Sequence, residues 1–257
     1  MSVLQELNKA LVDGTIEVID LTAPLSSDTP TLSLPEPLGQ TWRFELELIS
    51  DCDDRGPLCY WNNIRTGEHT GTHFDSPNHW VTGRHLEDVS AVSPSKLLRP
   101  AAVLDFTAQA DADPDFLLSV ENVQAWIGEH GDLPAGGWLL YRTGWSARMH
   151  AEGAMHNADA EGPHTPGISP ECATWLAEET PIIGVGVETV GNDAGSAADM
   201  DPPFPCHAAM HGAGKYGLTM LQNLDQLPPM GSMVFAGPLP IVNGSGSPAR
   251  VLALKER

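Results

Sequence analysis

The chain has 257 residues, enough to bury a sizeable core, and its 34 acidic against 13 basic residues give a formal net charge of -21. Such an acidic surface repels phosphate groups, which argues against nucleic acids and anionic membranes as partners. No run of about 18 apolar residues occurs, and residues 1–10 lack the basic and apolar segments of a signal peptide, so we expect a cytoplasmic protein. The four cysteines form no C-x-x-C pair, and we expect free thiols.

The first elements are predicted to be a short helix and two strands separated by a long loop. Ser2 can cap a helix that ends at Gly14, and residues 16–21 follow as a strand. Residues 23–40 are rich in proline, serine, threonine and aspartate, which is typical of a loop. Residues 42–48 alternate apolar with charged side chains, and this alternation predicts a half-buried strand.

The rest of the chain mixes strands with helices. The predicted strands are 101–106, 138–141, 182–187, 233–236 and 250–254. Helices are predicted between Ser119 and Gly131, between Ser169 and Pro181, and over residues 206–210, with a long loop at 146–167. Helices separate only some of the strands and no internal repeat occurs. We therefore expect one mixed α/β domain over residues 1–257 rather than a regular doubly wound sheet.

Residues 69–79, H-T-G-T-H-F-D-S-P-N-H, are the most distinctive stretch of the chain. They contain three histidines and one aspartate: His69, His73, Asp75 and His79. These four side chains would point to one face of an extended strand, but its ends would lie about 33 Å apart. A common site therefore requires bends, which Gly71 and Pro77 permit. Imidazole and carboxylate groups at this spacing suit zinc, manganese or iron.

This stretch resembles the H-x-G-T-H-x-D-x-P-x-H signature of the cyclase-like metal-dependent hydrolases, a family that includes kynurenine formamidases and isatin hydrolases. Further segments resemble the family in the same order: Asp20-Leu21-Thr22, Arg142-Thr143-Gly144-Trp145, residues 184–189 (G-V-G-V-E-T), and Gly246-Ser247-Pro248-Ala249-Arg250. The resemblance runs from about Asp20 to Arg250. It implies a single mixed α/β domain, a swivelling β/β/α fold with a barrel-like sheet.

The resemblance also implies a set of metal ligands that includes His69, His73 and Asp75. Farther along, Gln222 with the two residues after it resembles an E-N-L segment, whose glutamate helps formamidase-like members to hold two metals. Because an amide oxygen is a weaker ligand than a carboxylate, we expect one ion bound by His69, His73, Asp75 and Gln222. Manganese is the expected metal and zinc the alternative. Without the resemblance, Gln222 would be read as an ordinary helix or loop residue.

Three further histidines have several possible roles. His207 and His211 are four residues apart on a predicted helix, so they can face one way and form a rival H-x-x-x-H site. By resemblance, His207 matches a family histidine that helps formamidase-like members to hold two metals, whereas His211 falls on an apolar family position. With a single ion, His207 is expected to be free to contact substrate or a proton-transferring water. His79 lies beyond Pro77 and is expected to be out of easy reach of the ion, as a general acid or base. A structural histidine that anchors the loop is the alternative.

The implied reaction is hydrolysis of a cyclic amide by a metal-activated water, with His79 or His207 passing a proton to the leaving nitrogen. No G-x-S-x-G segment suggests a serine hydrolase. The resemblance is closest to the isatin hydrolases, so isatin, opened to isatinate, is the expected small-molecule substrate. Trp61, Phe74 and Trp80 are predicted to contact its flat aromatic ring, although core packing is an equal alternative for each of them.

Two other functions are left open. An arylformamidase acting on N-formylkynurenine would need a second metal held by His207 and a carboxylate, and Gln222 argues against that. A non-catalytic metal-binding sensor would have no need of proton-transfer groups such as His79 and His207. Family members are commonly dimers, so the resemblance implies a homodimer.

Overall fold

The computed structural model of the protein describes residues 2–32, 34, 38–149, 151 and 153–257. Its main sheet contains β1 (Ile16–Asp20), β4 (His73–Asp75), β5 (Leu98–Asp105), β7 (Trp138–Arg142), β9 (Gly184–Val187), β10 (Tyr216–Thr219), β11 (Ser232–Pro238) and β12 (Gly246–Glu256). The strand order is β1-β12-β11-β5-β7-β9-β10-β4, and β12 also pairs with β4. This second pairing closes seven strands into a barrel, with β1 beside β12. The predicted mixed α/β domain with a barrel-like sheet is thus confirmed.

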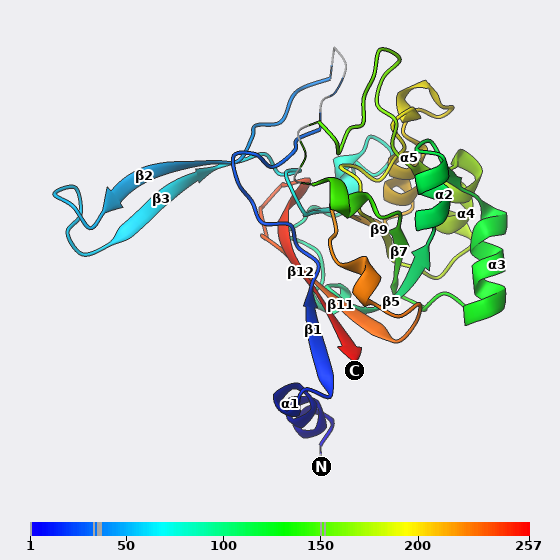
Figure 1. The fold of residues 1–257 in the computed structure, drawn as a ribbon, viewed down its shortest axis with the longest axis horizontal. Coiled ribbons are helices and arrows are strands. Elements are labelled where there is room, and N and C mark those ends of the chain that lie inside the picture. The colour runs from blue at the N-terminus through cyan, green and yellow to red at the C-terminus, as the bar shows by residue number, and fades with distance from the viewer. Residues whose placement is uncertain (1, 33, 35–37, 150, 152) are drawn as a thin grey trace.

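The helices gather mainly beside the parallel strands of the barrel. They are α1 (Val3–Asp13), α2 (Thr107–Ala112), α3 (Val120–His130), α4 (Pro170–Glu178) and α5 (Pro205–Gly212). Figure 1 shows α2 to α5 on the side of β5, β7 and β9, whereas α1 stands apart at the start of β1. Ser2, Ser119 and Ser169 cap the first turns of α1, α3 and α4 as expected.

Smaller elements complete the fold. β6 (Leu117–Leu118) and β8 (Gly167–Ile168) form a short parallel pair. Single 3-10 turns occur at Pro77–His79, Pro94–Lys96, Trp145–Arg148, Ala197–Asp199 and Leu224–Gln226. No helix in the described part of the chain is long and apolar enough to cross a membrane.

The central strands divide the hydrophobic core into two parts because successive side chains of a strand point to opposite faces. In β7, Trp138 and Leu140 belong to the cluster that fills the barrel, together with Phe74 of β4. Leu139 and Tyr141 point the other way and pack with residues of α3 and α4. The parallel strands are therefore buried on both faces, which explains their nearly continuous apolar sequences.

A two-stranded arm departs from the predicted pattern. β2 (Glu45–Asp51) and β3 (Tyr60–Arg65) pair with each other, and Figure 1 shows them extending away from the barrel. The strand predicted at 42–48 therefore begins three residues later, and most of it is exposed rather than half-buried. Trp61 lies on this arm and is 54% exposed.

Truncation of Leu140 should measure how much the barrel core contributes to stability. Leu140 is fully buried, so Leu140→Ala should lower the free energy of unfolding by about 2–5 kcal/mol. Leu46→Ala, on the exposed arm, is the matched control and should change it by less than about 0.5 kcal/mol. Urea denaturation followed by circular dichroism gives both values. Equal effects of the two substitutions would contradict the assignment of the core.

Candidate metal centre and active site

The strand β4 places the two central motif residues on one face of the barrel wall. His73 pairs with Thr219 of β10 and Pro248 of β12, and Asp75 pairs with Gly217 and Gly246. The intervening Phe74 points into the barrel, where it is fully buried and its ring lies 5.2 Å from that of Tyr216. The prediction that Phe74 contacts substrate is therefore corrected: this side chain closes the core below the site.

The chain bends before β4 and so returns His69 to the same place. Gly71 has a φ of 66°, and a Cβ at this position would lie 2.5 Å from Leu25 Cδ2. His73 Nδ1 lies 2.7 Å from the carbonyl oxygen of Gly71, and His69 Nδ1 lies 2.8 Å from Asp75 Oδ1. With its Nδ1–H donated to this carbonyl, His73 turns Nε2 toward Asp75 Oδ1, 3.3 Å away.

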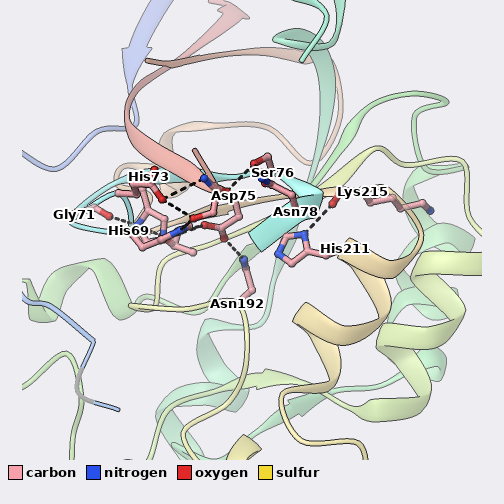
Figure 2. Close-up of polar contacts among 12 residues, drawn as sticks. His69, Gly71, His73, Asp75, Ser76, Asn78, Asn192, His211 and Lys215 are labelled. Carbon is pink, nitrogen blue, oxygen red and sulfur yellow. Dashed lines mark hydrogen bonds and ion pairs between the residues drawn. The ribbon is translucent and has the colours of Figure 1, made fainter. Parts of the chain in front are cut away.

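The buried carboxylate of Asp75 lies at the centre of the site. Burial opposes its ionisation, but charge interaction with His73 and hydrogen bonds from His69 and His73 outweigh that cost and hold the Asp75 pKa well below 3.8. Its second oxygen accepts a 2.9 Å hydrogen bond from Asn192 Nδ2, as Figure 2 shows. Asp75 is therefore an anion, and its orientation is held by His69 and His73 at one oxygen and by Asn192 at the other.

His79 lies closer to these groups than the sequence suggested. The 3-10 turn at Pro77–His79 brings its ring onto that of His69, with centroids 3.8 Å apart. One ring nitrogen of each histidine and a carboxylate oxygen of Asp75 all lie within 4.8 Å of one another. The expectation that His79 is out of reach of a shared ion is therefore wrong. Burial, followed by the nearby His69, lowers the pKa of His79 to about 2, so its imidazole is neutral.

Helix α5 supplies the opposite side of the site with His207 and His211. Both offer a ring nitrogen within 4.8 Å of an Asp75 oxygen and of each other. The sequence raised this pair but did not assign His211 to the site. His211 is 1% exposed; its Nδ1 lies 3.0 Å from the Lys215 carbonyl oxygen, and its buried Nε2 has no hydrogen-bond partner among the described residues (Figure 2).

The two groups of donors suit a divalent metal. Both contain Asp75, with His69 and His79 on one side and His207 and His211 on the other. A buried imidazole nitrogen without a partner, as in His211, is chemically suited to an ion or to a water bound near one. Imidazole nitrogens around a carboxylate match the ligand preferences of zinc, manganese and iron.

Two of the predicted site residues lie differently from the expectation. The side-chain amide of Gln222 donates to the carbonyls of Met220 and Leu221, and none of its contacts with described residues joins it to His69, His73 or Asp75. Trp61 lies on the arm and not beside these groups, which corrects its predicted contact with substrate in the same chain.

Trp80, in contrast, lies against the site. Its ring centroid is 4.9 Å from that of His207 and 6.0 Å from that of His79. It also forms an edge contact with Phe204, which precedes α5. Trp80 therefore joins the turn after β4 to the helix that supplies His207 and His211.

Other motif residues hold the scaffold together. Asp20 and Arg250, from the first and last motifs, form a bidentate ion pair with contacts of 3.0 and 2.6 Å. Buried Glu188 accepts hydrogen bonds from the backbone N–H groups of Thr143 and Trp145. Burial raises the pKa of Glu188 in spite of these donors. Asp20, Arg250 and Glu188 thus connect segments of the fold, and we assign them no part in the reaction.

Sequence reasoning missed Asn192, Asp193, Thr219 and Ser245, which hold the histidines and Asp75 in place. Thr219 Oγ1 lies 2.8 Å from His73 Nδ1, and Ser245 Oγ lies 2.7 Å from His69 Nε2. Asn192 contacts Asp75, and Asp193 contacts His207. These residues carry no distinctive spacing, and only the paired strands bring them to the motif.

Comparison with known proteins gives consistent matches. The Cyclase family model matches residues 19–194. An isatin hydrolase of Roseibium aggregatum is 43% identical over 256 residues, which covers 98% of this chain and 97% of the relative. The structure of isatin hydrolase A from Ralstonia solanacearum is similar with a TM-score of 0.96 and 48% identity, covering 100% of this chain and 98% of that one. An isatin hydrolase bound to the product analogue thioisatinate gives a TM-score of 0.97 and 41% identity, with 100% of both chains covered.

Gly217 lies directly against the Asp75 carboxylate and the hydrogen bond that it accepts from Asn192. A Cβ on Gly217 would lie 2.3 Å from Asn192 Nδ2 and 2.5 Å from Asp75 Oδ2, so Gly217→Ala should displace the hydrogen bond that aims the carboxylate. We expect divalent-metal affinity to fall about 10- to 100-fold, as for lost supporting contacts in other metal sites. Isothermal titration with Mn²⁺ or Zn²⁺ measures this.

The matched control is Gly128→Ala in α3, where an added Cβ would meet no atom within 4 Å. That variant should bind metal like the unaltered protein and gain up to about 1 kcal/mol of stability from helix propensity. Unchanged metal affinity in Gly217→Ala would show that the orientation of the Asp75 carboxylate does not affect metal binding.

Proposed function

The chain belongs to the Cyclase family, and from that premise we propose that it is a metal-dependent hydrolase that opens the lactam ring of isatin to give isatinate. The observation that carries the proposal is the convergence of His69, His73 and Asp75 in a chain that is 43% identical to an isatin hydrolase. That the chain is an enzyme of the hydrolase class follows from the same relationship.

In the proposed site, His69, His73 and Asp75 would hold one divalent ion, manganese or alternatively zinc. The ion would supply Lewis-acid polarisation of the attacked carbonyl and a bound water of lowered pKa. Asp75 is ionised and the buried His79 is neutral, so neither group has to lose a proton before it can donate a lone pair. His79 is therefore better suited to assist at the ion than to deliver a proton. Gln222 would require a change of side-chain orientation to join the ligands.

His207 is the better candidate for proton transfer. Burial lowers its pKa, but the carboxylate of Asp193 more than offsets this, and the net pKa is raised above 6.5. In the balanced reaction, the oxygen of water bonds to the amide carbon and the carbon–nitrogen bond breaks. The leaving nitrogen takes up a proton from His207 and becomes an aromatic amine. The attacking water gives up two protons as the former amide carbon becomes the carboxylate; one restores His207 and the other passes to solvent. Trp80, next to His207, is the predicted contact for the aromatic ring of the substrate.

A second candidate function is hydrolysis of N-formylkynurenine with two metals. The donor group of Asp75, His207 and His211 favours it, because a second ion there would share Asp75 with the first. In that case His207 would be a ligand and would not carry the proton. The number of ions per chain therefore distinguishes the two candidates. A homodimer and a cytoplasmic location stay predictions alongside the proposed function.

The test is ring opening of isatin, followed by the loss of its visible absorbance, with protein reconstituted with Mn²⁺ or Zn²⁺ and assayed for bound metal. We expect about one ion per chain, and at least a 100-fold loss of turnover after chelation or in Asp75→Ala, because both remove the ion's Lewis acid. Asp225→Ala, at an exposed carboxylate, is the matched control and should keep full activity.

Two results would decide against the proposal. Absence of isatin turnover with either metal would remove it. Two ions per chain together with faster turnover of N-formylkynurenine than of isatin would replace it with the formamidase function.

A further inference from the structure

We propose that Asp193 is a positioning residue for this reaction, which fixes the orientation and tautomer of His207 so that Nε2 faces the reacting centre. The inference rests on the proposed role of His207 in proton transfer. It concerns a residue between β9 and α5 that no sequence motif singled out.

The carboxylate of Asp193 is bound to α5 at several points. Its Oδ1 accepts a 2.7 Å hydrogen bond from the backbone N–H of Cys206, and its Oδ2 accepts one of 3.2 Å from the backbone N–H of His207. The same Oδ2 contacts Nδ1 of the His207 ring. Its side chain is 4% exposed and that of His207 is 11% exposed. Both ends of the contact are therefore fixed to the same helical turn.

Helix α5 needs this carboxylate because its own start lacks a cap. The residue before it, Phe204, has a φ of 54° and gives no side-chain hydrogen bond, and Pro205 has no N–H to donate. The N–H groups of Cys206 and His207 are next in line, and Asp193 accepts from both. A carboxylate is favourable there because the amino end of a helix carries a partial positive charge. One side chain thus caps the helix and holds the ring of its third residue.

The contact with Nδ1 determines which nitrogen serves the reaction. A neutral imidazole has one N–H and one lone pair, and an ionised carboxylate can only accept. With Nδ1–H donated to Asp193, Nε2 carries the lone pair and is the nitrogen left for water, substrate or a metal. The ring is enclosed by Trp80, His79 and His211, with centroids at 4.9, 5.5 and 5.5 Å. His207 Nε2 is therefore the ring nitrogen that Asp193 leaves free beside these side chains.

Asn192, the residue before Asp193, holds Asp75 in a similar way. Asn192 donates from Nδ2 to Asp75 Oδ2 at 2.9 Å (Figure 2), while Asp193 holds His207. One dipeptide after β9 thus aims both the proposed metal-binding carboxylate and the proposed proton donor. These two groups are therefore oriented by neighbouring residues of one loop.

The decisive variant is Asp193→Asn, in the full-length Mn²⁺-loaded protein. The amide oxygen can still cap Cys206, but the amide N–H₂ now faces Nδ1 and favours the tautomer with hydrogen on Nε2. We expect kcat for isatin to fall about 10- to 100-fold, as for other lost partners of site histidines, with KM changed less than about threefold. The matched control Ser169→Ala removes the cap of α4, should cost about 1 kcal/mol of stability, and should leave kcat unchanged.

A readout independent of turnover separates this inference from the proposed function. ¹⁵N NMR of histidine-labelled, chelator-treated protein, at a pH where His207 is neutral, should show hydrogen on Nδ1 in the unaltered chain and on Nε2 in Asp193→Asn. If the chain does not hydrolyse isatin, the proposed function fails while this result still tests the orientation. An unchanged tautomer, or kcat within twofold of the unaltered protein, would overturn the inference. If Asp193→Asn does not fold, Asp193→Ser, which keeps a capping hydroxyl, replaces it with the same two criteria.

Discussion

Closure of the barrel through β4 is the constraint on which the rest of the structure depends. This strand has three residues, yet it pairs with β10 on one side and β12 on the other. Its middle residue, Phe74, anchors it in the core, so the period of two turns His73 and Asp75 to the opposite face. A shift of the register by one residue would exchange the two faces and destroy the site. The stability of the barrel and the geometry of the site therefore have the same origin.

Burial of one negative charge explains many residues that lie far from the motif in the sequence. An ionised carboxylate in the interior requires partners for both oxygens. Asp75 obtains them from His69 and His73 on one side and from Asn192 on the other. Gly217 leaves room for the hydrogen bond between Asn192 and Asp75, because a side chain at this position would overlap both residues. These contacts thus hold the Asp75 carboxylate in one orientation, as a catalytic centre requires.

The sequence alone predicted the fold class, most strands of the sheet and the central motif. The strands and the motif succeed because local patterns carry them: buried apolar runs, serine caps, and liganding side chains at short spacing. The barrel-like sheet, in contrast, was implied by the family resemblance. The sequence did not predict the exposed arm, because the alternation at residues 42–48 is the same whether the apolar face meets a core or solvent. Trp61, expected at the site because it lies near the motif in the sequence, is on the second strand of this arm. Phe74 was misassigned because the direction of a side chain depends on which strands pair.

The parts of the site beyond the motif could not be predicted from spacing. His211 comes to Asp75 only because β10 pairs with β4 and α5 precedes β10. His79 is four residues past Asp75 and beyond Pro77, and the spacing alone does not reveal that a 3-10 turn folds it onto His69. Asn192 and Asp193 follow β9, which pairs with β10, the strand that lies beside β4 in the sheet. Their roles come from topology.

The central claim is that closure of the barrel creates a metal site at His69, His73 and Asp75. Anomalous diffraction from crystals grown with Mn²⁺ tests it most directly. The account predicts a manganese peak bonded to an Asp75 oxygen and to ring nitrogens of His69 and His73, at about 2.0–2.3 Å. An ion held by Asp75, His207 and His211 without His69 and His73, or no manganese at Asp75, would contradict it.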